Sequence, residues 1–465
     1  MSAAKKAAII GGGVIGGGWA ARFMLNGWDV SVFDPDPEAS RKIGEVLDNA
    51  RRALPGLYDR ALPPEGSLTF CENMAEAVAD ADWVQESVPE RLDLKHRVHA
   101  ELTRLAPATA VIGSSTSGFK PSELTQQGAR VIVAHPFNPV YLLPLIELVG
   151  DADHCALAEP TLHEIGLYPL TVRKEIDAHI ADRLLEAVWR ECLWLVKDGI
   201  ATTSEIDEAI RMGFGLRWAQ MGIFETYRIA GGEAGMKHFM EQFGPALEWP
   251  WTKLMDVPEY TPELVDLIAG QSDAQSGHMS IRELERLRDD NLVGMMRALK
   301  KTGSGAGAVI TAHEAQLTLP DATDLPVTVH RAIPQSWTDY NGHMNETHYV
   351  ELGSQATDGF MALIGADAEY IAGGQSYFTT ENTVRYLSEL HAGDVVRVTT
   401  QVLVGEGKKM QLLHRIMRAD GTLAATVKSF MLHVDLGARR SSLPAEAVAE
   451  RLAQYTQAHA GMSAE

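Results

Sequence analysis

Short apolar runs rich in β-branched residues alternate with helical periods through the first third of the chain. Six of these runs predict strands, at Ala7–Ile10, Val30–Phe33, Leu68–Cys71, Trp83–Ser87, Ala110–Ser114 and Val131–Ala134. Strands that alternate with helices pack as a doubly wound parallel sheet, so we expect residues 1–175 to form one α/β Rossmann-type domain. In such a sheet, functional side chains gather at the carboxyl ends of the strands.

After this domain, the apolar positions change to helical spacing. His179–Lys197 is the clearest case, and Gly199 ends it. The spacing predicts an all-α domain over residues 176–315. Residues 316–326 contain Pro, Asp and Thr without a helical period, which is typical of a linker.

Residues 327–440 combine long strands with one helix, His348–Ile364, which is interrupted by glycines. The strands are predicted at Val327–Arg331, Tyr377–Arg385, Val395–Val404, Met410–Met417 and Leu423–Val434. One helix wrapped by an antiparallel sheet is an α+β hotdog arrangement. Residues 441–465 are expected to form a terminal amphipathic helix and a tail.

The charge of the chain excludes some partners. Its 465 residues carry a net charge of −21, whereas nucleic acids and anionic membranes bind clustered Lys and Arg. This charge favours solubility or attraction of a cationic substrate. Cys71, Cys155 and Cys192 lie far apart, so we expect reduced thiols in a cytoplasmic protein, with no disulfide framework and no metal site. No stretch resembles a signal peptide or a membrane span.

A glycine loop follows the first predicted strand. It reads Gly11-Gly12-Gly13-Val14-Ile15-Gly16 and contains the spacing G-x-G-x-x-G. Asp34 ends the second strand, where its carboxylate can hydrogen-bond both ribose hydroxyls and repel a 2′-phosphate. A merely flexible glycine loop is the alternative. Strand, loop, helix, strand and acid follow in register, however, which favours NAD as the cofactor.

Two titratable residues flank the loop that follows the last of these strands. His135 ends the run Val131–Val133, and Glu147 lies twelve residues later in the apolar run Leu142–Val149. A histidine can take and return a proton near neutral pH, and a buried carboxylate can fix its tautomer. If the loop folds back, the two residues form a base and its partner. Otherwise His135 is a core histidine and Glu147 an unrelated glutamate at a helix end.

Further polar residues follow the neighbouring strands. Glu90 and Lys95 come after one strand, Ser117 after the next, and Asn138 shortly after His135. A hydroxyl, a histidine and an asparagine beside a nicotinamide suit the oxidation of an alcohol. The alternatives are that Ser117 caps a helix and that Lys95 lies on a solvated helix face.

The stretches Glu86–Lys95, Ser114–Gly118 and Ala134–Pro139, together with the glycine loop, resemble the 3-hydroxyacyl-CoA dehydrogenase family. The resemblance covers residues 5 to about 300. It implies NAD-dependent oxidation of a 3-hydroxyl group on a carboxylic-acid derivative. By position it implies His135 as proton acceptor with Glu147 as its partner, Ser117 at the substrate hydroxyl and nicotinamide, and Glu90, Lys95 and Asn138 as residues that help hold the cofactor.

The stretch Gly213–Glu225 resembles a branch of this family that oxidises free 3-hydroxy acids, L-carnitine and L-gulonate among them. Arg217 would then pair with the substrate carboxylate, and Trp218 and Phe224 would surround a trimethylammonium group. Asp182 stands where the family usually has asparagine and would add negative charge. The alternatives are that these aromatic residues belong to a dimer interface or core, and that Asp182 only favours the start of a helix.

The loop T-D-Y-N-G-H-M-N, Thr338–Asn345, is similar to acyl-CoA thioesterases of the 4-hydroxybenzoyl-CoA class. The resemblance implies Asp339 as base or nucleophile, with backbone N–H groups of Gly342–Met344 as the oxyanion site. Glu351 is a second candidate carboxylate. The alternative is that the loop is only a turn built from good turn residues.

Together the two resemblances imply a bifunctional chain. The first part would oxidise L-carnitine to 3-dehydrocarnitine, and the second would hydrolyse betainyl-CoA to glycine betaine and coenzyme A. The alternatives are a dehydrogenase for L-gulonate or a 3-hydroxyacyl-CoA, with a hotdog domain that only binds acyl-CoA or dimerises. Both families usually self-associate, so a homodimer is expected.

Overall fold

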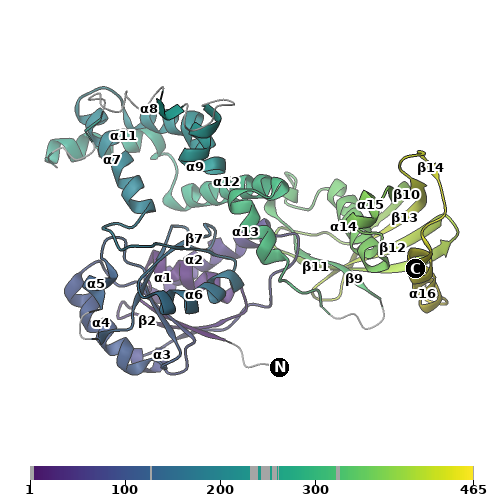
Figure 1. The fold of residues 1–465 in the computed structure, drawn as a ribbon, viewed down its shortest axis with the longest axis horizontal. Helices are drawn as coiled ribbons and strands as arrows, with labels where there is room; N and C mark the ends of the chain where they lie inside the picture. Colours follow the sequence, from purple (N-terminus) through teal and green to yellow (C-terminus); the bar gives the residue numbers. More distant parts are fainter. Residues whose placement is uncertain are drawn as a thin grey trace. The chain divides into compact units, whose positions relative to one another are not determined.

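The computed structural model describes residues 5–125, 128–230, 239–241, 252–253, 259, 261–320 and 325–463. The chain divides into two compact units (Figure 1). The first contains Met1–Ala50 and Pro64–His313, and the second contains Arg51–Pro63 and Glu314–Glu465. The finer division into five segments stays a prediction, and residues 321–324 of the expected linker lie outside the described residues.

The first unit contains an eight-stranded sheet in the order β3-β2-β1-β4-β5-β6-β7-β8. Its strands are β1 Lys6–Ile10, β2 Asp29–Phe33, β3 Leu68–Phe70, β4 Trp83–Glu86, β5 Val111–Ser114, β6 Ile132–Pro136, β7 Leu145–Val149 and β8 Tyr168–Thr171. The six predicted strands are confirmed and run parallel. The sheet extends beyond these six strands: the short β6–β7 connection makes an antiparallel hairpin, which was not predicted, and β8 then pairs parallel to β7.

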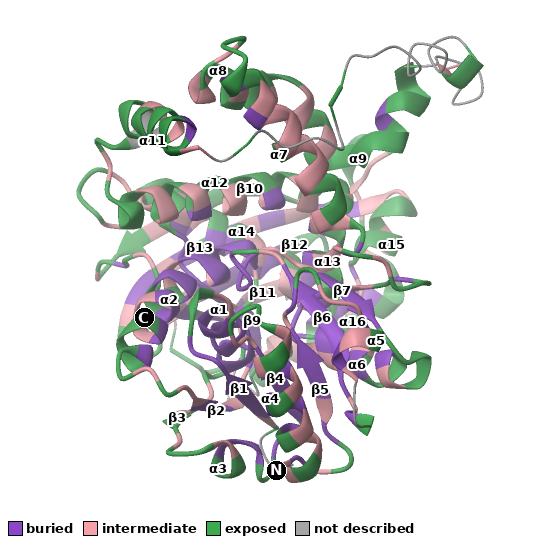
Figure 2. Ribbon diagram, turned by 90° about the vertical axis from the view of Figure 1, so that its left-hand side faces the viewer, coloured by how far each residue is buried: buried purple, intermediate pink, exposed green. Residues whose placement is uncertain are grey.

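Helices cover both faces of this sheet. They are α1 Val14–Met24, α2 Ala39–Ala53, α3 Met74–Val78, α4 Leu92–Leu105, α5 Pro121–Leu124 and α6 Ala152–Glu164. A Cβ on Gly16 of α1 would lie 3.2 Å from the Ile9 side chain, so α1 covers the face of β1 that Ile9 occupies. Ala8 and Ile10 point to the opposite face, where they share a buried cluster with residues of α3 and α4. Figure 2 shows the central strands as largely buried.

The remainder of the first unit is helical in the described residues, as predicted. The elements are α7 Ala181–Lys197, α8 Thr203–Ala209, the π-helix η3 Ile210–Phe214, α9 Gly215–Ala230, α11 Pro262–Ser276, α12 Ile281–Thr302 and α13 Gly305–Glu314. No helix in the described part of the chain has both the length and the apolar character needed to cross a bilayer.

The second unit has the predicted hotdog topology. Its antiparallel sheet has the order β10-β13-β12-β11-β9, and β14 pairs with β13. The strands are β9 Val327–Ala332, β10 Gln375–Tyr386, β11 Val395–Glu406, β12 Lys409–Arg418, β13 Leu423–Asp435 and β14 Arg440–Ser441, and the helices are α14 Glu346–Ile364, α15 Ala368–Ala372 and α16 Glu446–Ala458.

Helix α14 is continuous, so the expectation that glycines interrupt it is wrong. A Cβ on Gly353 would lie 2.6 Å from Val427 on β13, and a Cβ on Gly359 would lie 2.6 Å from the carbonyl oxygen of Thr328 on β9. These glycines therefore let the helix approach the sheet closely.

The segment Arg51–Pro63 belongs to the second unit, although its sequence neighbours belong to the first. It contains the 3-10 helix η1 Leu54–Leu57. The backbone N–H of Ala61 donates to the carbonyl oxygen of His330 in β9. Asp59 Oδ1 lies 3.3 Å from Nη1 of the buried Arg331. The apolar pattern of this segment gave no indication of this placement.

Candidate active sites

The β6–β7 hairpin brings His135 and Glu147 together. The two residues are directly opposite each other in the register of the strands, so their side chains share one face. His135 Nδ1 lies 3.1 Å from Glu147 Oε2, and both side chains are buried. Glu147 therefore lies in a strand beside the histidine, and not at an unrelated helix end.

The other carboxylate oxygen of Glu147 accepts two backbone hydrogen bonds from the start of α7. The N–H groups of Ile180 and Ala181 donate to Oε1 at 2.8 and 3.0 Å. Burial alone raises the pKa of Glu147, but the hydrogen bonds from His135, Ala181 and Ile180 outweigh it, so the pKa lies below its usual value. The carboxylate is thus ionised and can stabilise an imidazolium.

The turn before α7 has an unusual backbone. Ala178 and His179 have φ angles of +59° and +52°, a region that non-glycine residues rarely occupy. The turn aims the next two N–H groups at Glu147. Strain of this kind persists where the surrounding structure imposes it, often at functional sites.

The second nitrogen of His135 faces two polar side chains. Because an ionised carboxylate can only accept hydrogen bonds, Nδ1 of His135 carries the proton and donates it to Glu147 as a hydrogen bond. Nε2 of the neutral ring is then free to accept. Ser117 Oγ lies 3.2 Å from Nε2, and Asp182 Oδ2 lies 3.6 Å from it. Ser117 does not cap α5, because Lys120 occupies the N-cap position. A substrate hydroxyl at Nε2 would thus meet a base, a hydroxyl and a carboxylate.

His179 is a neighbour of this site that the sequence reasoning missed. Its ring centroid lies 5.5 Å from that of His135, and its Nε2 lies 3.3 Å from the carbonyl oxygen of Thr116. Burial first, and then the charge of His135, lower the pKa of His179. A neutral ring here avoids a second cation beside the base. His179 lies within the stretch Ala178–Asp182, but its position in the sequence did not indicate that its side chain lies beside His135.

The glycine loop lines a pocket of 750 Å³ together with Asp34, Ser87 and Val88. Gly11 has a φ of +105°, and a Cβ there would lie 2.6 Å from the carbonyl oxygen of Ser87. Asp34 accepts hydrogen bonds from the N–H groups of Gly12 and Asp36. The acid is therefore fixed at the wall of the pocket, as the ribose-binding expectation requires.

The pocket side of the glycine loop is open. A Cβ on Gly13 would meet no atom within 4 Å, and α1 begins directly after it with Val14 and Ile15. A helix N-terminus at the loop directs N–H groups and a positive dipole end to the site where a pyrophosphate would lie. These residues fit a dinucleotide.

Lys95 is a buried ion-pair partner, so the solvated-face alternative is wrong. Its Nζ lies 2.8 Å from Glu86 Oε1 and 3.3 Å from Glu90 Oε2. The other oxygen of Glu90 accepts from the N–H of Gly118 at 3.2 Å and from the Thr116 hydroxyl. Glu90 therefore ties Lys95 to the loop that carries Ser117. A direct contact of either residue with the cofactor stays a prediction.

Glu86 is the buried centre of this network and was not singled out from the sequence. It accepts a hydrogen bond from Ser114 Oγ at 2.6 Å and lies 2.8 Å from His99 Nε2. Burial raises its pKa, but the hydrogen bond with His99 and the charge of Lys95 outweigh this and lower the pKa to about 2. An acid within a strand predicted to be buried was the available signal, because a buried carboxylate needs partners.

The remaining predicted site residues have defined positions, but the structure does not connect them to His135. Asn138 is exposed after β6, with a cis bond to Pro139. Arg217, Trp218 and Phe224 lie on α9, where Trp218 packs against Phe214 with ring centroids 4.5 Å apart. Within the described residues, none of these three side chains makes a hydrogen bond, ion pair or ring contact with His135. Their substrate roles stay predictions.

The hotdog signature forms a closed loop. Thr338 and Met344 pair as a β-bridge, and the N–H of Asp339 donates to the carbonyl oxygen of His343 at 3.0 Å. Asp339 Oδ1 accepts from the N–H of Asn341 at 2.8 Å, which is the geometry of an Asx turn. The half-buried carboxylate keeps Oδ2 for other partners.

Two of the three proposed oxyanion donors are already engaged. The N–H of Gly342 donates to the backbone carbonyl oxygen of Asp339, and the N–H of Met344 donates to the backbone carbonyl oxygen of Leu390. The N–H of His343 has no acceptor among the described residues, so it is the one donor free for a ligand. Glu351, the second candidate acid, is exposed on α14 and lies 2.9 Å from His348 Nδ1.

Fold and site together define an NAD-binding dehydrogenase of the 3-hydroxyacyl-CoA type joined to a thioesterase-like domain. The family described as 3-hydroxyacyl-CoA dehydrogenase, NAD binding domain, matches residues 6–162. The C-terminal domain of the same family matches residues 179–258, and the thioesterase-like superfamily matches residues 333–452. The expected fold class and the expected cofactor, NAD, are thereby confirmed.

Individual relatives extend this match over the full length. The L-carnitine dehydrogenase/betainyl-CoA thioesterase of Ruegeria pomeroyi is 64% identical, over 98% of this chain and 97% of its own. The L-carnitine dehydrogenase of Mesorhizobium japonicum is 62% identical over 66% of this chain and 86% of its own. The chain therefore belongs to the family of L-carnitine dehydrogenase/betainyl-CoA thioesterases.

A solved structure supports the dehydrogenase part. The crystal structure of 5-formyl-3-hydroxy-2-methylpyridine 4-carboxylic acid 5-dehydrogenase, an NAD+ dependent dismutase, covers 64% of this chain and 99% of its own. Its sequence is 25% identical and its TM-score is 0.54.

Proposed function

We propose that this chain oxidises L-carnitine to 3-dehydrocarnitine with NAD, and that it hydrolyses betainyl-CoA to glycine betaine and coenzyme A. The observation that carries the proposal is the match to a relative named for both activities over 98% of this chain. The two candidate sites give each activity its own residues in one chain.

The proposed oxidation depends on the pair His135 and Glu147. Nε2 of His135 takes the proton of the 3-hydroxyl group, which Ser117 orients from 3.2 Å away. Glu147, held ionised by the N–H groups at the start of α7, stabilises the resulting imidazolium through Nδ1. When bound, NAD supplies the acceptor for the hydride that leaves C3. The glycine loop and Asp34 would hold its pyrophosphate and ribose.

The proposed hydrolysis uses Asp339 in the hotdog domain. Its carboxylate either attacks the thioester carbonyl or activates a water molecule that does so. The N–H of His343 is a donor for the oxyanion that forms. The C–S bond then breaks, the thiolate of coenzyme A leaves and takes a proton, and water supplies the oxygen of the glycine betaine carboxylate.

A substrate panel tests the first activity. NAD-coupled turnover is measured with L-carnitine, L-gulonate and 3-hydroxybutyryl-CoA at saturating NAD. We expect kcat/KM to be highest for L-carnitine. A higher kcat/KM for either of the other two would contradict the carnitine proposal but leave the dehydrogenase assignment intact. Release of free coenzyme A from betainyl-CoA tests the second activity in the same preparation.

Asp182 is proposed to attract the trimethylammonium end of L-carnitine, because its carboxylate lies beside the reacting group. Replacing it by asparagine removes one charge with little change of shape. We expect the KM for L-carnitine to rise about tenfold, which corresponds to about 1.4 kcal/mol of lost attraction. The uncharged isostere 3-hydroxy-5,5-dimethylhexanoate should lose no affinity. Equal effects on both substrates would instead assign Asp182 to the helix start alone.

A homodimer is proposed to form through the helical part. Helix α7 exposes a stripe of large apolar side chains, Leu184, Leu185 and Trp189, the last 51% exposed. The stripe adjoins an apolar pocket of 530 Å³ lined by α7 and α8. Exposed apolar patches of this kind are typical of protein interfaces.

We expect Trp189→Glu to convert the dimer into monomers in size-exclusion chromatography with light scattering, since a charge there must be desolvated on association. Leu157→Glu is the matched control, because Leu157 is also a large exposed apolar residue, 62% exposed, but lies on α6. A dimer that survives the first substitution, or one that both substitutions disrupt, would contradict this interface.

The cytoplasmic location also stays a proposal, which rests on the cysteine spacing.

A further inference from the structure

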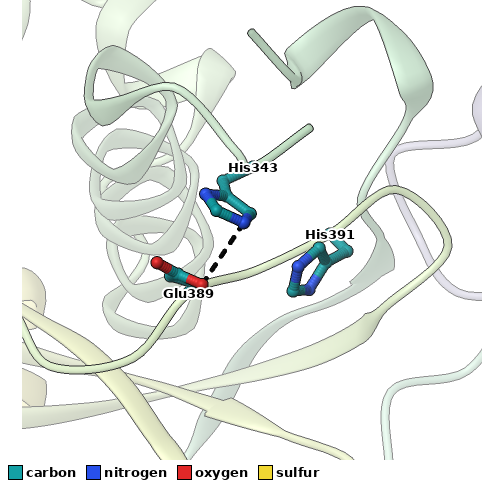
Figure 3. A group of neighbouring side chains, drawn as sticks. All are labelled: His343, Glu389 and His391. Atoms are coloured by element: carbon teal, nitrogen blue, oxygen red, sulfur yellow. Dashed lines mark ion pairs between the residues drawn. The ribbon is translucent and has the colours of Figure 1, made fainter. Parts of the chain in front are cut away.

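Three side chains that the proposed reactions do not use converge beside the Asp339 loop. They are His343, Glu389 and His391 (Figure 3). Each offers one ligand atom, and these atoms lie within 4.8 Å of one another. His343 Nε2 lies 3.3 Å from Glu389 Oε2. Among the described residues, this is the one such group of three or more metal-ligating side chains.

The backbone explains why they meet. The N–H of Met344 donates to the carbonyl oxygen of Leu390 at 2.7 Å, which fixes the two segments side by side. Met344 and Leu390 are buried. Their sequence neighbours His343, Glu389 and His391 are directed away from the core and are partly or fully exposed. Burial of one residue in each segment therefore places three polar side chains on one patch of surface.

A turn holds the third ligand in place. The N–H of His391 donates to Asp394 Oδ2 at 2.9 Å, and the N–H of Asp394 donates to the carbonyl oxygen of His391 at 3.1 Å. Asp394 Oδ2 also lies 3.8 Å from His391 Nδ1. A carboxylate near a ligating imidazole is the usual outer partner at metal sites, because it orients the ring and raises its basicity.

The donor set selects the kind of ion. Two imidazoles and one carboxylate suit zinc and its transition-metal neighbours, whereas calcium and magnesium prefer oxygen ligands alone. Bonds of about 2.0–2.1 Å in tetrahedral geometry place ligand atoms about 3.4 Å apart, close to the distance between His343 and Glu389. The other ligand atoms lie within 4.8 Å, and all three side chains are partly or fully exposed, so a bound ion can draw them together. Three protein ligands leave one position for water.

We propose that His343, Glu389 and His391 form a binding site for one divalent transition-metal ion of the zinc class. The site departs from the expectation, drawn from the cysteines, that the chain has no metal site. It rests on the geometry of the hotdog domain and not on the proposed activities. Because His343 also accepts the backbone hydrogen bond of Asp339, a bound ion would be attached to the loop that carries the candidate catalytic acid.

Cobalt(II) is a suitable probe, because its ligand-field absorption reports the coordination of the ion. The untagged full chain is stripped with a chelator and titrated with Co²⁺, and Zn²⁺ is then added in competition. We expect tetrahedral or five-coordinate absorption bands that saturate at one ion per chain and disappear with Zn²⁺. Absence of such bands in the wild-type chain would overturn the proposal.

Single substitutions identify the ligands. Loss of an outer partner usually costs 10–100-fold in affinity, so loss of a direct ligand in His391→Ala or Glu389→Gln should weaken Zn²⁺ binding by at least about 100-fold. His154→Ala is the control, because His154 is a half-buried histidine 3.5 Å from a single acid, Asp151. It should bind as the wild type does. Wild-type affinity in both ligand variants would overturn the site, and circular dichroism verifies that each variant is folded.

Discussion

Replacing His135 by glutamine is expected to lower kcat for L-carnitine oxidation by about a thousandfold, because the amide cannot take the hydroxyl proton. Hydrolysis of betainyl-CoA by the same preparation should stay unchanged, which controls for folding. The affinity for NAD, measured by quenching of tryptophan fluorescence, should also be preserved, since His135 does not line the pocket of the glycine loop. Turnover within tenfold of the wild type would contradict the role of His135 as the base.

Glu147→Gln is the companion substitution. The amide oxygen can still accept from the N–H groups of Ile180 and Ala181, so the start of α7 keeps its hydrogen bonds. The charge that stabilises the imidazolium is lost, and the amide nitrogen can impose the other tautomer on His135. We expect kcat to fall by a factor on the order of a hundred, less than for His135→Gln. A larger effect in Glu147→Gln would indicate that Glu147 itself transfers the proton.

Asp339→Asn is expected to lower the rate of betainyl-CoA hydrolysis by about a thousandfold and to leave L-carnitine oxidation unchanged. The substitution separates catalysis from structure, because asparagine retains the side-chain oxygen that accepts from Asn341. The loop should therefore keep its shape. The measurement is release of free coenzyme A, followed with a thiol reagent.

Glu351→Gln is the matched comparison for this prediction. Glu351 is the other candidate carboxylate, but it is exposed and paired with His348. We expect its replacement to change hydrolysis by less than about tenfold, as for an ordinary surface ion pair. A reversal, with Glu351→Gln inactive and Asp339→Asn active, would transfer the catalytic role to Glu351. Full activity in both variants would contradict a catalytic role for either carboxylate. Absence of hydrolysis in the wild-type chain would support a hotdog domain that only binds acyl-CoA.

The local pattern was sufficient to predict most elements of both sheets. Alternating apolar runs and helical periods identified the six parallel strands and the five long strands of the hotdog, because burial selects apolar residues at fixed periods. The β6–β7 hairpin was missed, since an apolar run does not reveal the direction of its strand. The sequence also left undecided whether His135 pairs with Glu147, because the pairing depends on the register of that hairpin.

Contacts between distant segments explain the other gaps. The glycines of α14 suggested breaks, but whether a glycine breaks a helix or permits close packing depends on what lies opposite it. Likewise, Glu389 and His391 are far from His343 in the sequence, and the hydrogen bond between Met344 and Leu390 brings the two segments side by side. Such meetings follow from tertiary packing, which the spacing within one segment does not encode.

The segment Arg51–Pro63 has a consequence for attempts to separate the two activities. A gene fragment that begins at Glu314 would encode the hotdog strands but not Asp59, the acid beside the buried guanidinium of Arg331, nor the backbone donor of Ala61. An autonomous thioesterase would need this stretch grafted onto its amino terminus. No single cleavage of the polypeptide therefore separates the dehydrogenase unit from the thioesterase unit.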